Sequence, residues 1–222
     1  MKTFKYSELK QVRIVALEEI ARDVFVLSFE KIYNFSAGQV IALSLEADDP
    51  SARLYSVCSG INEDLMSILF NIIPQGKITG KLSKLKPCDY IYCSQPFGSF
   101  LGNIEPGYWI ASGTGIAPYL SMFRSGLGAN KVLIHGGRKL DSFYFLDSLE
   151  EYFKEHYIRC CSTEKGKGVF SGRLTTYLKQ KDELPSDYRY YLCGSSEMVV
   201  ETRDILISKG IPFNNIMSEI YF

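Results

Sequence analysis

The run RLYS at residues 53–56 holds a guanidinium, a phenol ring and a hydroxyl within one predicted strand. Alternation points Arg53 and Tyr55 to one face and Ser56 to the other, unless the strand is twisted or ends there. A guanidinium pairs with phosphate, a phenol ring can lie on an isoalloxazine, and a hydroxyl can bond the ring edge. These groups suit a flavin nucleotide, although a surface arginine beside a packed tyrosine more often explains such a run.

Two glycine turns offer backbone amides to phosphate groups. Gly80 begins the run GKLS, which opens a short predicted helix, KLSKL, and a helix N-terminus suits a pyrophosphate. The run GTGIAP at 113–118 follows the apolar run YWIA, and its glycines permit close approach of a phosphate-bearing ligand. An ordinary turn into a surface helix more often explains the first run. The second is not GxGxxG, so the standard dinucleotide fingerprint is absent.

Cys193 ends a further predicted strand, YRYYLC, and Gly194 follows it. A small polarizable thiol at a strand end can sit beside a nicotinamide ring, and the glycine leaves the space for it. His135 also follows a predicted strand and is a candidate contact of the same dinucleotide. A buried cysteine is more often only a core residue, so this pair is weak evidence when it stands alone.

The first half of the chain consists of short segments that are rich in β-branched and aromatic residues. Gly, Pro, Asn or Asp bounds most of them, as is typical of strands. Six closely spaced strands with little helical pattern between them predict an antiparallel barrel. The predicted strands are residues 11–16, 24–29, 39–45, 53–59, 65–73 and 90–95.

After residue 103 the pattern changes to strand, glycine turn and helix. Apolar runs at 108–111, 131–135 and 190–193 each precede glycine and a helical stretch, as in an open parallel sheet. We place the domain boundary in the segment 101–107, which gives domains 1–102 and 103–222. Ligands of such sheets bind beyond the carboxyl ends of the strands, where these glycine turns lie.

Composition excludes several classes of protein. The 222 residues are 46% hydrophobic and 23% charged, with 25 basic and 25 acidic side chains, so neither disorder nor nucleic-acid binding is expected. No apolar run approaches the ~20 residues that span a bilayer, and the N-terminal run MKTFKYSELK lacks a signal-peptide core. We therefore expect a cytoplasmic protein without a membrane partner.

The six cysteines form no CxxC pair, which argues against a zinc or iron–sulfur site. They are too few for a disulfide scaffold in a chain of this size. We expect reduced thiols, no metal, and an organic redox cofactor.

The chain contains five short motifs in this order: RLYS, GKLS, GTGIAP, CGSSEM and the final EIYF. In this order, from residue 38 to residue 222, the chain resembles the ferredoxin–NADP reductase family, and its aromatic ending resembles the bacterial branch. The resemblance implies an FAD-binding antiparallel β-barrel domain followed by an NADP-binding α/β domain with a parallel sheet. It also implies an oxidoreductase in which FAD carries electrons between NADPH and ferredoxin or flavodoxin.

The resemblance implies roles in flavin binding for residues of the first domain. Arg53 would hold a phosphate of FAD, Tyr55 would stack on the flavin, and Ser56 would bond near its N5 atom. The residues implied on the pyrophosphate and ribityl side are Gly80, Leu82 and Ser83, with Ser59 assisting. A basic patch of Lys77, Lys81, Lys84 and Lys86 could dock an acidic carrier, but a solvated basic face explains it equally well.

In the second domain the resemblance implies that Thr114 faces the nicotinamide dinucleotide and that Cys193 lies near the nicotinamide. Tyr221 would cover the flavin ring and Phe222 the adenine. Glu219 would lie near the reaction centre and deliver protons. With Ser56, the residues Cys193, Glu219 and Tyr221 form the implied catalytic group.

Recognition of the 2′-phosphate of NADPH needs basic groups. Arg138 and Arg173 match two of the three arginines that the bacterial branch uses, but Thr163 stands where the third is expected. The Thr163 hydroxyl could still bond phosphate, and Lys165 or Lys167 could supply the charge or be plain loop residues. We therefore expect NADPH to be preferred over NADH by a reduced margin.

Three other functions stay open at this level. The chain could be an NADH-linked flavin reductase or an oxygenase-type reductase on the same scaffold. It could also be an electron-relay flavoprotein subunit of a larger complex. Subunits of that kind commonly carry a cysteine cluster near the C-terminus. Oxygenase reductases often carry a fused iron–sulfur domain, and the cysteines of this chain could not ligate its cluster.

Overall fold

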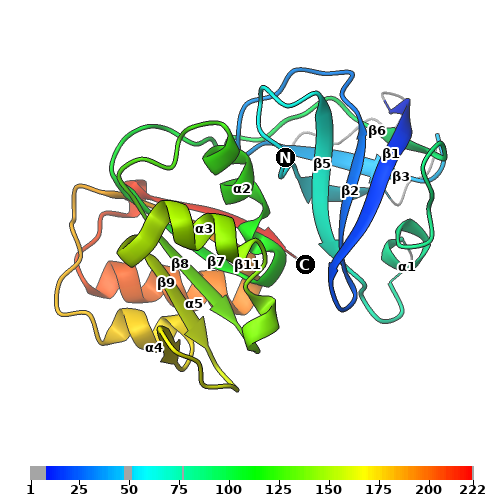
Figure 1. Cartoon of the computed structure of the whole chain (residues 1–222). Coiled ribbons are helices and arrows are strands. Elements are labelled where there is room, and N and C mark those ends of the chain that lie inside the picture. The colour runs from blue at the N-terminus through cyan, green and yellow to red at the C-terminus, as the bar shows by residue number, and fades with distance from the viewer. Residues whose placement is uncertain (1–8, 48–51, 77, 222) are drawn as a thin grey trace. The chain divides into compact units, whose positions relative to one another are not determined.

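The computed structural model describes residues 9–47, 52–76 and 78–221, which form two compact units (Figure 1). The first unit contains the described residues up to Gly102 and also Ala117–Ser125. The second contains Asn103–Ile116 and the described residues from Gly126 onward. None of the described helices is both long and apolar enough to cross a membrane.

The first unit is an antiparallel sheet of six strands that curls into a barrel-like shape. The ladder runs in the order β4-β3-β6-β1-β2-β5, and each neighbouring pair is antiparallel. A bridge between Val57 and Ile68 links the two ends without a continuous ladder, so the barrel is not fully closed. The strands are β1 (Lys10–Ala21), β2 (Val24–Glu30), β3 (Val40–Ser44), β4 (Arg53–Ser56), β5 (Leu65–Asn71) and β6 (Tyr90–Cys93).

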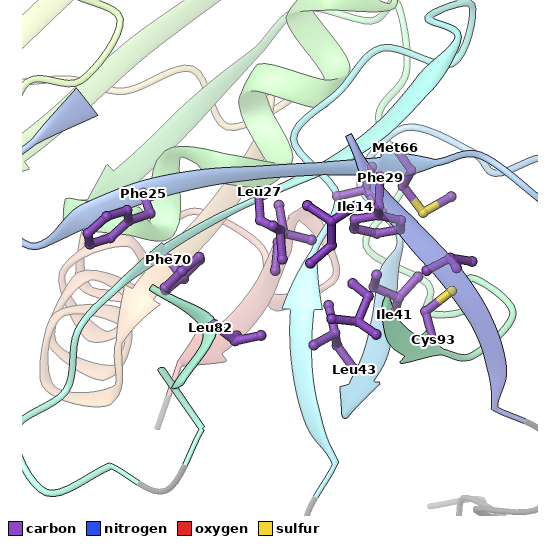
Figure 2. Packing of buried hydrophobic residues seen from close by; sticks show 14 of the residues in the cluster. Ile14, Phe25, Leu27, Phe29, Ile41, Leu43, Met66, Phe70, Leu82 and Cys93 are labelled. Carbon is purple, nitrogen blue, oxygen red and sulfur yellow. The ribbon is translucent and has the colours of Figure 1, made fainter. Parts of the chain in front are cut away.

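Alternating apolar residues of these strands build one core, shown in Figure 2. Ile14, Leu27 and Ile41 come from three different strands, and all three are completely buried. The short helix α1 (Thr79–Leu82) closes onto this core through Leu82, which has no exposed surface. All six predicted strands are present, and the predicted antiparallel barrel is confirmed.

The second unit is a parallel sheet of six strands in the order β10-β9-β8-β7-β11-β12. Its strands are β7 (Gly107–Ser112), β8 (Lys131–Gly137), β9 (Tyr157–Cys161), β10 (Val169–Ser171), β11 (Arg189–Ser195) and β12 (Ile216–Tyr221). The strand order reverses between β7 and β11, which is where open α/β sheets bind ligands. The predicted parallel sheet is confirmed, but the sequence pattern identifies β7, β8 and β11 and misses the other three strands.

Helices cover both faces of the parallel sheet. On one face the Phe153 ring of α3 (Leu146–Phe153) packs edge-on against Trp109, with the ring centroids 5.9 Å apart. The next residue of β7, Ile110, points the other way and packs with α4 (Leu174–Lys179) and α5 (Ser196–Ser208).

Helix α2 (Ala117–Arg124) follows β7 in the chain but packs within the first unit. Arg124 donates a hydrogen bond of 3.1 Å to the carbonyl of Cys58. Gly38, at φ +99°, approaches α2 so closely that an added Cβ would lie 2.6 Å from Cε of Met122. Only glycine suits this position, because an L side chain would be strained there as well as crowded.

A buried lysine holds the segment that enters the second unit. Lys131, at the start of β8, is only 3% exposed, and its ammonium donates to the carbonyl oxygens of Asn103, at 3.0 Å, and of Glu105. The ammonium also lies 5.8 Å from the centre of the Trp109 ring. Burial lowers the pKa of Lys131, while the charge of Glu105 opposes that shift.

Candidate functional site

Two glycine turns that lie far apart in the sequence meet backbone to backbone. The run GTGIAP leaves β7 as a 3₁₀ turn over Gly113–Ile116, and an added Cβ on Gly115 would lie 2.3 Å from the carbonyl oxygen of Cys193. Gly194 has φ +148°, and its added Cβ would lie 2.2 Å from Oγ of Ser112. Glycine is therefore needed on both sides, and the structure brings together two motifs that the sequence suggests separately.

Cys193 also meets two residues of β12. The parallel register places it opposite Glu219, and Ser195 opposite Tyr221. The thiol is completely buried, and burial raises its pKa well above the ordinary value; Glu219 raises the pKa further and a hydrogen bond from Tyr221 opposes this. The thiol is therefore neutral at physiological pH.

Three of the four residues in the implied catalytic group thus gather at the ends of β11 and β12. They are Cys193, Glu219 and Tyr221, whereas Ser56 belongs to the first unit. Phe222 lies outside the described residues.

The side chain of His135 holds the GTGIAP turn through a hydrogen bond to its first residue, Gly113. It is completely buried in β8, with Nδ1 3.1 Å from the Tyr157 hydroxyl and Nε2 3.3 Å from the carbonyl oxygen of Gly113. Burial lowers its pKa to about 4, although the bond to Gly113 acts in the other direction. In the neutral ring, Nε2–H donates to Gly113 and Nδ1 accepts from Tyr157. The His135 side chain has no exposed surface, and its expected contact with a dinucleotide stays a prediction.

A cavity of about 500 Å³ opens at the carboxyl ends of β7, β8, β9 and β11. Arg138 and Arg173, the two arginines predicted to bind the 2′-phosphate, both line it, whereas Thr114 does not. Gly113 also lines it, and an added Cβ there would meet nothing within 4 Å. The lining residues are Ser112, Gly113, Gly136, Gly137, Arg138, Ser142, Tyr144, Cys160, Ser162, Arg173, Leu174, Thr175, Ser195, Glu197, Met198 and Glu201.

The charges that line this cavity are two arginines and two carboxylates. No carboxylate of the described residues lies within ion-pair distance of Arg138, whereas Nη1 of Arg173 is 2.9 Å from Oε1 of Glu197. Glu201 accepts a hydrogen bond of 2.7 Å from Lys179, which is the main reason that its pKa is lowered. An anion that enters the cavity would therefore compete with Glu197 for Arg173, but with no carboxylate of the described residues for Arg138.

Thr163 holds the loop that follows β8. Its hydroxyl and its amide both donate to the carbonyl oxygen of Arg138, the amide at 3.0 Å. The hydroxyl thus holds the loop after β8, and its contact with a phosphate stays a prediction. Lys165 and Lys167 are not among the residues that line the cavity, and their role as a substitute for the missing arginine stays a prediction.

In the first unit the RLYS residues form β4. The ladder sets Arg53 opposite Leu43 and Tyr55 opposite Ile41, so these side chains share a face as predicted. Arg53 is exposed, while Tyr55 is half-buried with its ring edge-on to Phe70 at 6.4 Å between centroids. Burial raises the pKa of Tyr55 to about 12, with Arg53 acting against the shift.

Two of the implied flavin contacts, Ser56 and Ser59, are buried. Ser56 is 2% exposed at the end of β4. Ser59 has no exposed surface, and its hydroxyl accepts a hydrogen bond of 3.0 Å from the amide of Ser67. That bond ties the segment after β4 to β5, and a role for Ser59 toward a cofactor stays a prediction.

The helix expected over KLSKL begins earlier than predicted, so that Gly80 lies within it. The amides of Leu82 and Ser83 donate to carbonyls within this turn at 2.9 and 3.0 Å, and neither is free for a phosphate. Gly80 keeps open space, since an added Cβ would meet nothing within 4 Å. The nearby lysines Lys81, Lys84 and Lys86 are exposed, and Lys77 lies outside the described residues.

Comparison with known proteins places this architecture in one family. Residues 109–204 match the oxidoreductase NAD-binding domain. The flavodoxin/ferredoxin–NADP reductase of Buchnera aphidicola subsp. Baizongia pistaciae is 30% identical, over 88% of this chain and 89% of that protein. The probable electron transfer subunit of dihydroorotate dehydrogenase B (NAD(+)) from Pyrococcus abyssi is 29% identical, over 89% of this chain and 74% of that protein.

A solved structure shares the whole fold. The ferredoxin NADP+ reductase of Neisseria gonorrhoeae, with bound FAD and NADP, superposes with a TM-score of 0.84 at 21% identity, covering 97% of this chain and 99% of that one. The barrel-like sheet and the parallel sheet agree with this match. The chain therefore belongs to the ferredoxin–NADP reductase family.

Proposed function

We propose that the chain is a ferredoxin– or flavodoxin–NADP reductase, in which FAD carries electrons between NADPH and a one-electron carrier. The observation that carries this proposal is the cavity at the ends of β7, β8, β9 and β11, with Arg138 and Arg173 in its lining. Family membership supports the same reading, since its relatives include proteins named for this activity.

The residues present fit the two cofactors. Arg53 is exposed for a phosphate of FAD, and the half-buried Tyr55 offers a ring of raised pKa that stays a neutral phenol. The open face of Gly113 and the cavity beside it would take the dinucleotide. Bound FAD would supply the chemistry, accepting a hydride as an electron pair and giving up single electrons.

The chain's own groups would position the reactants. The neutral Cys193 thiol would add no charge beside the nicotinamide, and Gly194 lets the end of β11 lie close against Ser112. Glu219 is half-buried next to Cys193, where it would hold or pass a proton. Tyr221 would cover the flavin ring, with Ser56 near N5, Thr114 near the dinucleotide, and Phe222 on the adenine.

The proposal is tested with the purified chain. We expect a yellow protein that releases FAD rather than FMN on denaturation, and that oxidises NADPH with ferricyanide as acceptor. Chromatography of the released flavin and the absorbance of NADPH measure both results. FMN alone would contradict the adenine contact, and no oxidation without added partners would point to a relay subunit.

A second function, an NADH-linked electron transferase, is favoured by one observation. Thr163 stands where the bacterial branch has an arginine, and its hydroxyl donates to the carbonyl of Arg138, so one charged contact with the 2′-phosphate is missing. The Pyrococcus abyssi relative is named for NAD(+). Steady-state kinetics with both nucleotides separates the two functions, since equal or better use of NADH favours the second.

Removal of Tyr221 and Phe222 should change nucleotide binding while the fold stays intact. Without the Tyr221 ring the nicotinamide would stack on the flavin more freely, so we expect a lower KM for NADPH and an altered kcat. The Tyr221 bond to Cys193 would also be lost. Removal of Phe222 alone is the matched control, because it keeps that bond, and unchanged kinetics in the longer deletion would place the flavin away from Tyr221.

A further inference from the structure

The side chain of Glu197 reaches the cavity from the first turn of α5. Ser195 caps this helix, since its hydroxyl accepts from the amide of Met198, and the cap holds the first turn just after the Gly194 bend. Glu197 and its partner Arg173 both line the cavity, with 75% and 64% of their side chains exposed. The pair is thus open to a ligand that enters there.

The pairing changes what Arg173 offers to a phosphate. An exposed ion pair is weak, so a phosphate can displace Glu197 from the guanidinium. The displaced carboxylate stays close to the bound dianion and repels it. With Glu201 also in the lining, the two arginines are matched by two carboxylates, and the lining has no net positive charge.

A carboxylate in this position favours the other nucleotide. The unphosphorylated adenosine ribose of NADH carries a 2′-hydroxyl, which donates to a carboxylate, and acidic residues bind this group in dinucleotide folds. A 2′-phosphate is mostly a dianion at neutral pH, because its second pKa is about 6, and the dianion has no proton to donate to a carboxylate. Glu197 can therefore stabilise the ribose of NADH and oppose that of NADPH.

We propose that Glu197 is a specificity-determining residue that lowers the preference for NADPH over NADH by neutralising Arg173. The proposal rests on the proposed function, because it assumes that the adenosine end of the nucleotide lies in this cavity. It differs from the loss of an arginine at Thr163, since Glu197 weakens an arginine that is present.

The test uses the whole chain and two probes that carry no nicotinamide, 2′,5′-ADP and 5′-AMP, with affinities from calorimetry. Glu197→Gln keeps the shape of the side chain and removes its charge. We expect it to tighten 2′,5′-ADP binding roughly twofold to fivefold and to leave 5′-AMP equal or weaker. The kcat/KM ratio of NADPH to NADH should rise by a similar factor.

Glu201→Gln is the matched control, because Glu201 lines the same cavity one turn along α5 but pairs with Lys179. It should move the ratio of the two affinities much less than Glu197→Gln. In an Arg173→Ala background the gain from Glu197→Gln should shrink, and an unchanged gain would overturn neutralisation of Arg173 as the cause.

The outcomes separate the two proposals. If the parent binds both probes and Glu197→Gln leaves their ratio unchanged, Glu197 does not set specificity, while the proposed function stands. If the parent oxidises NADPH but binds neither probe, the adenosine end does not lie in this cavity and the role of Glu197 fails. If the parent does not oxidise NADPH, the proposed function fails as well.

Discussion

Replacing Arg53 with alanine is expected to weaken FAD binding by roughly tenfold to a hundredfold, since one charge-assisted phosphate contact contributes about 1.5–3 kcal/mol. The side chain is exposed on β4, so the substitution removes the contact without opening a cavity in the core. Titration of the apoprotein with FAD, followed by flavin fluorescence, measures the change. The protein should stay folded, because the strand keeps its ladder with β3.

The neighbouring residue provides a control. Leu54 is 60% exposed on the opposite face of the strand, and Leu54→Ala should bind FAD as the parent does. Arg53→Lys keeps the charge but loses the planar fork, so its loss of affinity should be intermediate. If Arg53→Ala retains the parent affinity, the RLYS motif does not hold the flavin phosphate.

Acidification should destabilise the protein through His135. Its pKa is about 4 in the folded protein, whereas the ordinary pKa of a solvated histidine is 6.5, so between these pH values the unfolded chain binds more protons than the folded one. The free energy of unfolding therefore falls as the pH falls through this window. The contribution is about 3 kcal/mol by about pH 4, because each pH unit between the two values is worth about 1.4 kcal/mol.

Denaturant unfolding at several pH values between 7 and 4 measures this slope. His135→Gln should remove most of that contribution. The quantity to compare is the slope of the unfolding free energy against pH, because the substitution can also change the stability at every pH. His156→Gln is the control substitution, since the His156 side chain is 63% exposed and its replacement leaves the buried imidazole in place. Equal slopes for parent and His135→Gln would mean that the imidazole is not held neutral by burial.

Much of the fold could be predicted from the sequence because local patterns determine it. The barrel strands alternate or run apolar between turn residues, and β7, β8 and β11 are apolar runs that end in glycine. Strands β10 and β12 lie at the edges of the sheet, where residues face solvent as well as core, so their sequences lack such runs. Strand β9 escapes prediction for a similar reason, because Arg159 interrupts its apolar run.

The candidate site was predictable only in part. The family resemblance implies roles for Cys193, Arg138 and Arg173, but the partners of these residues come from distant segments. Glu197 is visible in CGSSEM, yet only the fold sets it 2.9 Å from Arg173. The burial of His135 and the bond of the Thr163 hydroxyl depend in the same way on tertiary packing.

The hydrogen bonds of Lys131 to Asn103 and Glu105 limit where the second unit can be cut from the chain. Its ammonium is buried and satisfied by carbonyl oxygens of Asn103 and Glu105, which precede β7. A fragment that begins at Gly107 would keep the whole parallel sheet but leave this charge without its acceptors, and a buried unsatisfied cation is destabilising. Expression of the second unit by itself, for crystallisation or for fusion to another redox domain, should therefore start no later than Asn103.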